Sequence, residues 1–257
     1  MAFSKVNGIT INWEVRGEGF PLLLIHGLWL DKTMWDAEAI LKHFAQTNKV
    51  VAYDCRGHGQ SDKPDNYSLA DHVVDAFGLM DSLGFDEFNV IGVSMGSYIA
   101  QGMAIANPQR IKKMVLVVPK AYGKTASIGQ ILAENAELLK TMDDDGRSAF
   151  MNQLVIHNSA ALKKYPDFLL NKLTDNQTKA AADALANFDF RNDLGNVKAK
   201  TLVISGKFDR VNPPEEAMIC AQGIAGAKLQ IMQYSAHAPT IEEPLRFTKL
   251  VEEFLAG

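Results

Sequence analysis

Residues 88–106, FNVIGVSMGSYIAQGMAIA, join a mostly apolar run of strand length to a segment with the periodicity of a helix. At the junction, GVSMG (residues 92–96), Ser94 stands between two glycines. A turn this sharp needs glycine on both sides, because a Cβ atom there would collide with the neighbouring backbone. The pattern is typical of an elbow that exposes a nucleophilic serine at the end of a strand. The alternative is a serine that only caps the helix, since serine is a favoured N-cap residue.

The same alternation of strand and helix extends along most of the chain. Apolar runs of strand length recur at 21–26, 49–54, 113–118, 200–206 and 228–234, and residues 1–15 indicate two short strands around Asn7-Gly8. Segments with helical periodicity accompany them at 36–45, 68–83, 214–225 and 244–255. Strands that are apolar on both faces belong in a buried parallel sheet. We therefore predict an α/β protein with a doubly wound, mostly parallel sheet.

One long stretch interrupts this alternation. Residues 120–197 contain no strong strand pattern, only helix-like segments at 126–141, 146–157, 163–173 and 176–188. This predicts a helical cap at 120–197, inserted between a first core part (1–119) and a second core part (198–257). Met151, Leu154 and Phe168 are candidate substrate contacts if their helix faces point inward. The alternative is that these side chains stabilise the packing of the cap itself.

A serine hydroxyl attacks only with the help of a base, and the base needs an orienting carboxylate. Among the six histidines, His237 lies in the loop between the last predicted strand and the final helix. Asp209 follows the predicted strand 200–206. Because the carboxyl ends of parallel strands carry the functional loops, we expect Ser94, Asp209 and His237 to meet at one edge of the sheet. A plain turn residue is the alternative interpretation of Asp209.

An attacked carbonyl also needs N–H donors for the oxyanion that develops on it. The backbone N–H of Met95, at the start of the helix after the elbow, is one candidate donor. The loop HGLW (residues 26–29) follows a buried strand and offers Leu28 as the second, with His26 bracing the loop. Trp29 in the same loop is a candidate substrate contact.

The composition excludes several classes of function. The chain has 257 residues, 22% of them charged, and a formal net charge of −4, so we expect no nucleic-acid or membrane partner. No apolar run approaches the length needed to span a bilayer. No metal-like ligand spacing and no glycine-rich nucleotide loop occur, so we expect neither a metal nor another cofactor. Two distant cysteines and an N-terminus unlike a signal peptide predict a cytoplasmic protein.

Five segments resemble, in this order, the landmark segments of the α/β-hydrolase fold family. They are LLLIHGLWLDKTMWD, VVAYDCRGHGQSDKP, VIGVSMGSYIAQGMAIANPQRIKKMVLV, TLVISGKFDRVNPPE and SAHAPTIEEP, and they cover nearly all of the chain outside 120–197. The resemblance implies an eight-stranded sheet and a Ser94–Asp209–His237 triad. It also implies an oxyanion hole at Leu28 and Met95, a cap at 120–197 and a scaffolding, not catalytic, role for Arg56, Gly57, His58 and Gly59. Among family members, the chain looks most similar to small esterases, enol-lactonases and metal-free haloperoxidases.

Two positions depart from relatives in this family. Haloalkane dehalogenases and epoxide hydrolases carry aspartate at the nucleophile position, and this chain has Ser94, which argues against those chemistries. The loop before His237 has Ser235-Ala236 where the family often has a glycine, so its path is left open.

We therefore expect a cofactor-free serine hydrolase that cleaves a carboxylic ester or lactone of a small-molecule substrate through an acyl-enzyme. The alternatives are a C–C bond hydrolase or an acyltransferase or perhydrolase with the same triad, or a small-ligand receptor without turnover. Lys120 or Lys124, just after the strand 113–118, could pair with a substrate carboxylate. The alternative is that these lysines are simply solvated.

Overall fold

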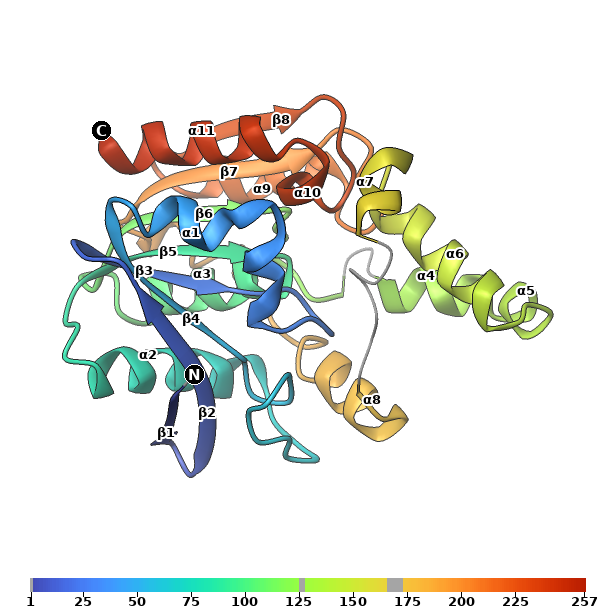
Figure 1. Ribbon diagram of the computed structural model, residues 1–257, viewed down its shortest axis with the longest axis horizontal. Helices are drawn as coiled ribbons and strands as arrows, with labels where there is room; N and C mark the ends of the chain where they lie inside the picture. The colour runs from blue at the N-terminus through green and yellow to red at the C-terminus, as the bar shows by residue number, and fades with distance from the viewer. Residues whose placement is uncertain (1, 125–127, 166–172) are drawn as a thin grey trace.

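The structure is a computed structural model that describes residues 2–124, 128–165 and 173–257. In this part of the chain, eight strands form one sheet in the order β1-β2-β4-β3-β5-β6-β7-β8 (Figure 1). The strands are β1 (Ala2–Val6), β2 (Ile9–Arg16), β3 (Phe20–Ile25), β4 (Asn48–Tyr53), β5 (Phe88–Val93), β6 (Ile111–Val117), β7 (Lys200–Gly206) and β8 (Lys228–Met232). The six strands from β4 to β8 in the sheet order run parallel, and β2 pairs antiparallel with β1 and β4. The predicted fold class is confirmed.

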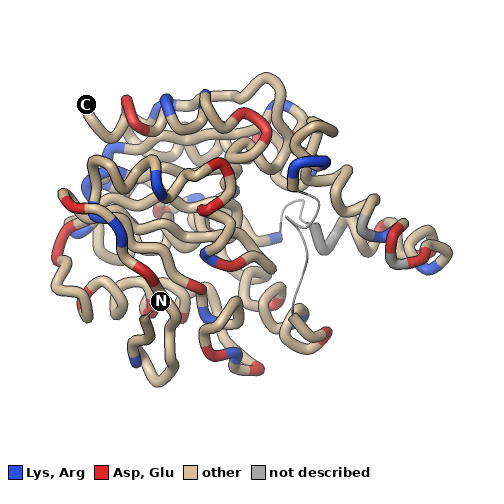
Figure 2. The backbone as a smooth tube through the Cα atoms, viewed as in Figure 1, with Lys and Arg blue, Asp and Glu red and all other residues tan. Residues whose placement is uncertain are grey.

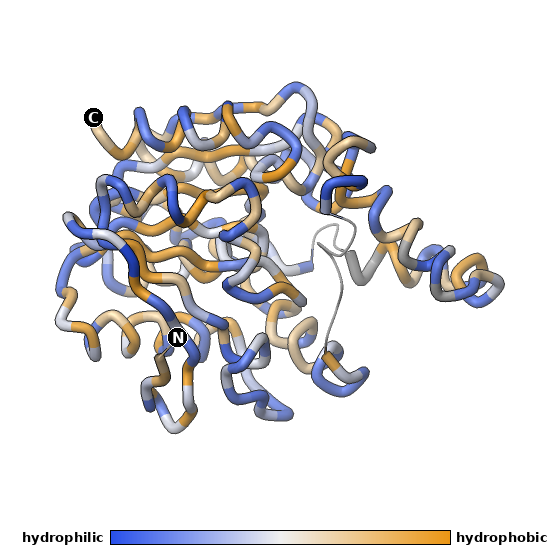
Figure 3. Tube along the Cα trace, in the orientation of Figure 1, coloured by the Kyte–Doolittle hydropathy of each residue, from blue (hydrophilic) through white to orange (hydrophobic). Residues whose placement is uncertain are grey.

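Helices cover both faces of the sheet, because alternate side chains of the central strands are buried on opposite sides. In β3, Leu23 and Ile25 join a core cluster with α2 (Leu69–Ser82), α3 (Met95–Ala106) and α9 (Pro214–Gly223). Leu22 and Leu24 join a second cluster with η1 (Lys32–Ala39), α1 (Ile40–Phe44) and α11 (Pro244–Ala256). Hydrophobic residues accordingly concentrate along the central strands (Figure 3), whereas acidic and basic residues intermingle on the surrounding helices and loops (Figure 2).

Five α-helices lie in the described part of the chain between β6 and β7, within the stretch for which the sequence predicts a cap. They are α4 (Ile128–Glu134), α5 (Ala136–Lys140), α6 (Asp144–Val155), α7 (Ser159–Lys164) and α8 (Asp175–Asp183), and they lie beyond one end of the strands (Figure 1). The predicted helix 126–141 is interrupted at Asn135, whose side-chain amide donates to the Ile131 carbonyl at 2.7 Å. Most of the predicted helix 163–173 falls outside the described residues.

Two further findings concern helices. The predicted helix 36–45 is wrong at its start, because Glu38 and Ala39, at the end of η1, adopt left-handed backbone conformations with φ of 53° and 54° that break the helix before α1. Short helices η2 (Leu194–Asn196) and α10 (Pro239–Glu242) complete the described part. None of the helices in the described ranges combines the length and apolar character that crossing a bilayer requires.

Candidate active site

Ser94 occupies a strained turn between β5 and α3. Its φ is 51° and its ψ is −114°, a conformation that a non-glycine residue rarely adopts. A Cβ atom on Gly92 would lie 2.1 Å from the Gly96 carbonyl oxygen, and one on Gly96 would lie 2.2 Å from the Ile25 carbonyl oxygen. Both glycines are therefore required by the close approach of backbone segments, and the turn holds Ser94 at the carboxyl end of β5.

Three side chains from three loops meet at this edge of the sheet. The Nε2 atom of His237 lies 2.9 Å from the Ser94 hydroxyl oxygen, and its Nδ1 atom lies 2.7 Å from Oδ2 of Asp209. The other carboxylate oxygen of Asp209 accepts the backbone N–H groups of Val211 and Asn212, both at 2.9 Å. Because Asp209 is only 4% exposed, these bonds fix its direction. The imidazole can thus donate to Asp209 and accept the serine proton.

The loop that carries His237 is tied to the connection between α6 and α7 by a buried carboxylate. One oxygen of Glu242 accepts the N–H of Ala236 at 2.8 Å, and the other accepts the N–H groups of His157 and Asn158 at 2.6 and 2.8 Å. Burial raises the pKa of Glu242, and these N–H groups oppose that rise. The path of the loop, which the sequence left open, is therefore held by Glu242, together with Glu243 and the Val155 carbonyl.

The loop after β3 is braced by His26. The Cys55 N–H donates to Nε2 of His26 at 2.9 Å, so the ring proton lies on Nδ1, which donates to the Gly27 carbonyl at 2.7 Å. The N–H of Leu28 belongs to the same trans peptide unit as that carbonyl and points to the opposite side. Leu28 lines the cavity described below. Met95 is the first residue of α3, so its N–H has no partner within the helix.

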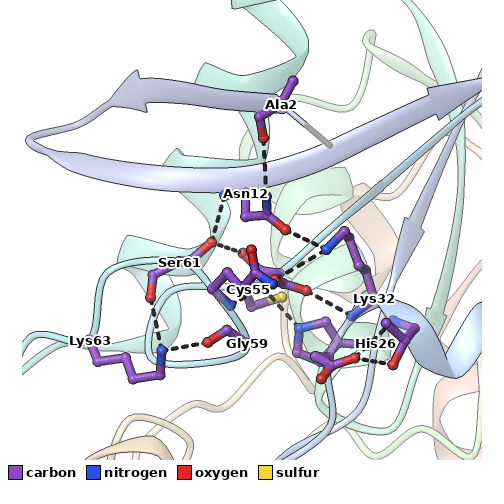
Figure 4. Close-up of polar contacts among 12 residues, drawn as sticks. Ala2, Asn12, His26, Lys32, Cys55, Gly59, Ser61 and Lys63 are labelled. Carbon is purple, nitrogen blue, oxygen red and sulfur yellow. Dashed lines mark hydrogen bonds and ion pairs between the residues drawn. The ribbon is translucent and has the colours of Figure 1, made fainter.

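A buried polar network fixes the far end of this loop (Figure 4). The backbone N–H of Lys32 donates to Oδ1 of Asp54 at 2.9 Å, and its ammonium lies 3.5 Å from Oδ2. The same ammonium donates to the side-chain oxygen of Asn12. Asp54 also accepts the N–H of Gln60 at 2.8 Å. Lys32 and Asp54 are both almost fully buried, so the loop from β3 to η1 is anchored at both ends.

A cavity of about 420 Å³ opens above the three side chains. Of the predicted substrate contacts, Trp29, Lys120 and Met151 line it, together with Leu28, Met95, Ser94 and His237. Leu154 does not line it and packs instead in a small cluster with Ile156, Val211 and Ile241. Phe168 lies outside the described residues. In addition, the Trp29 indole N–H donates to the Thr178 carbonyl at 3.4 Å, which connects the loop to α8.

Lys120 is buried beside this cavity. Only 3% of the residue is exposed, and its ammonium donates to the Gly123 carbonyl at 3.2 Å and lies 5.8 Å from the centre of the Tyr98 ring. Burial lowers the pKa of Lys120 to about 8, against a smaller opposing effect of Glu216. The alternative of a solvated Lys120 is therefore wrong.

Two cavity residues, Tyr98 and Asn212, were missed by the sequence analysis. Asn212 donates through its side-chain amide to the Tyr98 hydroxyl at 2.7 Å. Their spacing held a signal, since Tyr98 is one helical turn after Ser94 and Asn212 is three residues after Asp209. Across the described ranges, no three His, Cys, Asp or Glu side chains gather as they would around a metal ion.

Comparison with known proteins places this geometry in a family. A family model described as alpha/beta hydrolase fold matches residues 21–244. The chain is 31% identical to the 2-hydroxymuconate semialdehyde hydrolase of Pseudomonas putida, across 97% of this chain and 92% of the relative. The solved enol-lactonase of Burkholderia xenovorans is 25% identical with a TM-score of 0.85 over 100% of both chains. A solved hydrolase of Pseudomonas aeruginosa is 27% identical with a TM-score of 0.86, over 100% of this chain and 98% of that one.

The family model covers most of the chain, and the alignment with the Pseudomonas putida relative extends over nearly all of it. The protein is therefore a hydrolase that belongs to the α/β-hydrolase fold family.

Proposed function

We propose that the protein is a cofactor-free serine hydrolase that cleaves a carboxylic ester or lactone, with Ser94, His237 and Asp209 as its catalytic triad. The observation that carries this proposal is the continuous hydrogen-bonded line from the Ser94 hydroxyl through His237 to Asp209. A serine at a strained elbow with a base in direct contact is built for nucleophilic attack. The cavity above it is large enough for a small-molecule substrate.

The reaction follows from the positions of these groups. Ser94 Oγ attacks the substrate carbonyl carbon while its proton passes to His237 Nε2, and Asp209 stabilises the resulting imidazolium. The oxyanion accepts hydrogen bonds from the backbone N–H groups of Leu28 and Met95. His237 then protonates the leaving alcohol oxygen, and an acyl-enzyme remains on Ser94. A water that gives its proton to His237 attacks the acyl carbon, and the acid product leaves.

The direct test is Ser94→Ala assayed with p-nitrophenyl esters and lactones of graded acyl length. We expect hydrolysis to fall by at least about 10⁴-fold, because the nucleophile is removed. A fluorophosphonate probe, mapped by mass spectrometry, should label Ser94 in the unaltered protein. Ser82→Ala, at the exposed end of α2, is the matched control and should retain full activity. Hydrolysis that survives Ser94→Ala would contradict the proposal.

A second candidate, hydrolysis of a carbon–carbon bond next to a carbonyl, uses the same triad. The 31% identity to the 2-hydroxymuconate semialdehyde hydrolase of Pseudomonas putida favours it. Turnover of a vinylogous keto acid of that type, compared with turnover of the ester panel at equal protein concentration, separates the two reactions. If kcat/KM for the keto acid exceeds that for every ester, the proposed reaction becomes hydrolysis of a carbon–carbon bond and not of an ester.

Lys120 supports a preference for a substrate that carries an acidic group. It is a buried cation at the wall of an otherwise mainly apolar cavity. A substrate carboxylate there would form a charge-assisted hydrogen bond with the ammonium, and the attraction between the two charges would be weakly screened by solvent. Lys124 also lines the cavity but is exposed. We therefore assign carboxylate recognition to Lys120.

Lys120→Met tests this assignment with two esters of similar size, p-nitrophenyl butyrate and p-nitrophenyl hydrogen succinate. We expect kcat/KM for the acidic ester to fall roughly tenfold or more, since hydrogen bonds to charged groups contribute about 1.5–3 kcal/mol, with little change for the neutral ester. Because the ammonium is charged only below its pKa of about 8, the preference for the acidic ester should also decline as pH rises through 8. Lys124→Met is the matched control, and equal losses on both esters would refute the assignment.

A further inference from the structure

Tyr98 stands one helical turn after Ser94 on α3 and lines the same cavity. The residue is 4% exposed, and its ring packs against Phe188 with 5.1 Å between the ring centres. The backbone N–H of Tyr98 donates to the Ser94 carbonyl at 3.3 Å, so the two residues are linked through the first turn of the helix. The phenol is therefore held rigidly beside the nucleophile.

The position of the phenol hydroxyl is set by Asn212. The side-chain amide of Asn212 donates one hydrogen to the Tyr98 hydroxyl oxygen at 2.7 Å and the other to the Val118 carbonyl at 2.6 Å. The backbone N–H of Asn212 donates to Oδ1 of Asp209 at 2.9 Å. One residue thus anchors both the carboxylate behind His237 and the hydroxyl beside Ser94.

The direction of these bonds determines where the phenol hydrogen goes. Because the Tyr98 oxygen accepts from Asn212, its own hydrogen is available for a different acceptor. Burial raises the pKa of Tyr98, and smaller contributions from the side chains of Asn212 and Ser94 oppose this rise. The phenol therefore remains protonated and can act as a neutral hydrogen-bond donor.

We propose that Tyr98 is a positioning residue that donates its phenol hydrogen to the Ser94 hydroxyl oxygen and closes a ring of hydrogen bonds around the triad. This inference rests on the proposed role of Ser94 as nucleophile. The ring runs from Ser94 through His237, Asp209 and Asn212 to Tyr98, and back to Ser94.

The ring has a consequence for each half of the reaction. When Ser94 Oγ attacks, its proton moves to His237 and Oγ carries developing negative charge until its bond to the acyl carbon is complete. When the acyl-enzyme is hydrolysed, the same bond breaks and His237 returns the proton to Oγ. Tyr98 keeps its own proton throughout and stabilises Oγ at both points, as a preorganised donor does at an oxyanion.

Tyr98→Phe removes the hydroxyl and keeps the packing against Phe188. We expect the rate of fluorophosphonate labelling at Ser94 to fall about tenfold, which corresponds to one hydrogen bond. On p-nitrophenyl butyrate, kcat should fall by a similar factor with KM unchanged, because Oγ carries its charge only during reaction. Tyr67→Phe, which removes a phenol hydroxyl far from Ser94 in the chain, is the matched control and should label at the original rate.

The outcomes separate this inference from the proposed function. Labelling of Tyr98→Phe within twofold of the unaltered protein would overturn the role of Tyr98, whatever happens with esters. Failure of the unaltered protein to label at all would overturn both, since Ser94 would then not be nucleophilic. Slower labelling in Tyr98→Phe, together with no turnover of any ester or lactone, would support the role of Tyr98 and refute ester hydrolysis. A loss confined to KM, or matched by a lowered melting temperature, would show a packing role and overturn the proposal.

Discussion

At the scale of single residues, unfavourable backbone conformations gather around the cavity. Ser94 and Trp29 line it with φ of 51° and 64°, and Val118 follows β6 with φ of 47°. A left-handed conformation is especially costly for a β-branched residue such as Val118. The conformational energy of Val118 is offset by two hydrogen bonds. Its N–H donates to the Ile204 carbonyl at 2.7 Å, and its carbonyl accepts from the Asn212 side-chain amide. Strain stored in this way fixes the directions of the groups that the reaction needs.

The same close packing makes Gly96 intolerant of a side chain. In Gly96→Ala the new Cβ atom would lie 2.2 Å from the Ile25 carbonyl oxygen and 2.8 Å from that of His26, so the end of β3 must move. We expect unfolding in urea to show a loss of about 2–3 kcal/mol, typical of overpacking, and a large loss of kcat because the loop after β3, which carries Leu28, shifts. Gly195→Ala is the control, since a Cβ atom there meets nothing within 4 Å. Equal stabilities of the two variants would contradict this account.

At the scale of elements, the strands were predictable, and the helices between β6 and β7 were only partly so. Strands such as β5 and β7 are buried on both faces, so their positions appear directly as continuous apolar runs. The helices between β6 and β7 bury few large side chains, and their orientation depends on contacts that no local pattern encodes. In α6, Met151 and Val155 face the cavity because they are four residues apart, whereas Leu154 is turned away by the helical phase.

The candidate site shows the same division. Motifs at the ends of strands predicted Ser94, Asp209 and His237, because those positions follow from sheet topology alone. The contact between Tyr98 and Asn212 arises from packing between segments more than 100 residues apart in the chain, and Lys120 is buried against Gly123 and Tyr98. The spacing of Tyr98 from Ser94 and of Asn212 from Asp209 indicates only that these residues lie near the site, and no local pattern encodes the contacts themselves.

At the scale of the whole molecule, three buried histidines couple stability to pH. The ring centres of His26 and His58 lie 5.2 Å apart, and those of His58 and His72 lie 6.3 Å apart. Burial lowers the pKa of each, for His72 to about 3. In the unfolded chain these imidazoles titrate near 6.5. Below that pH the unfolded chain binds protons that the folded protein excludes, so stability falls as pH decreases from about 6.5 to about 3.

His72→Leu should weaken this dependence, because leucine does not titrate. The substitution breaks no hydrogen bond of the ring, since neither ring nitrogen of His72 has a hydrogen-bond partner among the described residues. We expect the free energy of unfolding lost between pH 7 and pH 5, measured with urea, to shrink by about 2 kcal/mol in this variant. Leu79→Ala, also buried on α2, is the control and should lose the same stability at both pH values. An unchanged pH dependence in His72→Leu would show that the pKa of His72 in the folded protein is not lowered.

The distribution of the site along the chain has a consequence for folding. Ser94 and His237 are 143 positions apart, and their contact requires β5, β7 and β8 to be in register with the inserted helices already between β6 and β7. Pairings of such long range form late, because closing long loops costs entropy before any contact repays it. Partly folded chains therefore hold Ser94 without its contact to His237. The hydrolytic activity recovered after dilution from denaturant therefore measures only the fraction of molecules in which the whole sheet has formed.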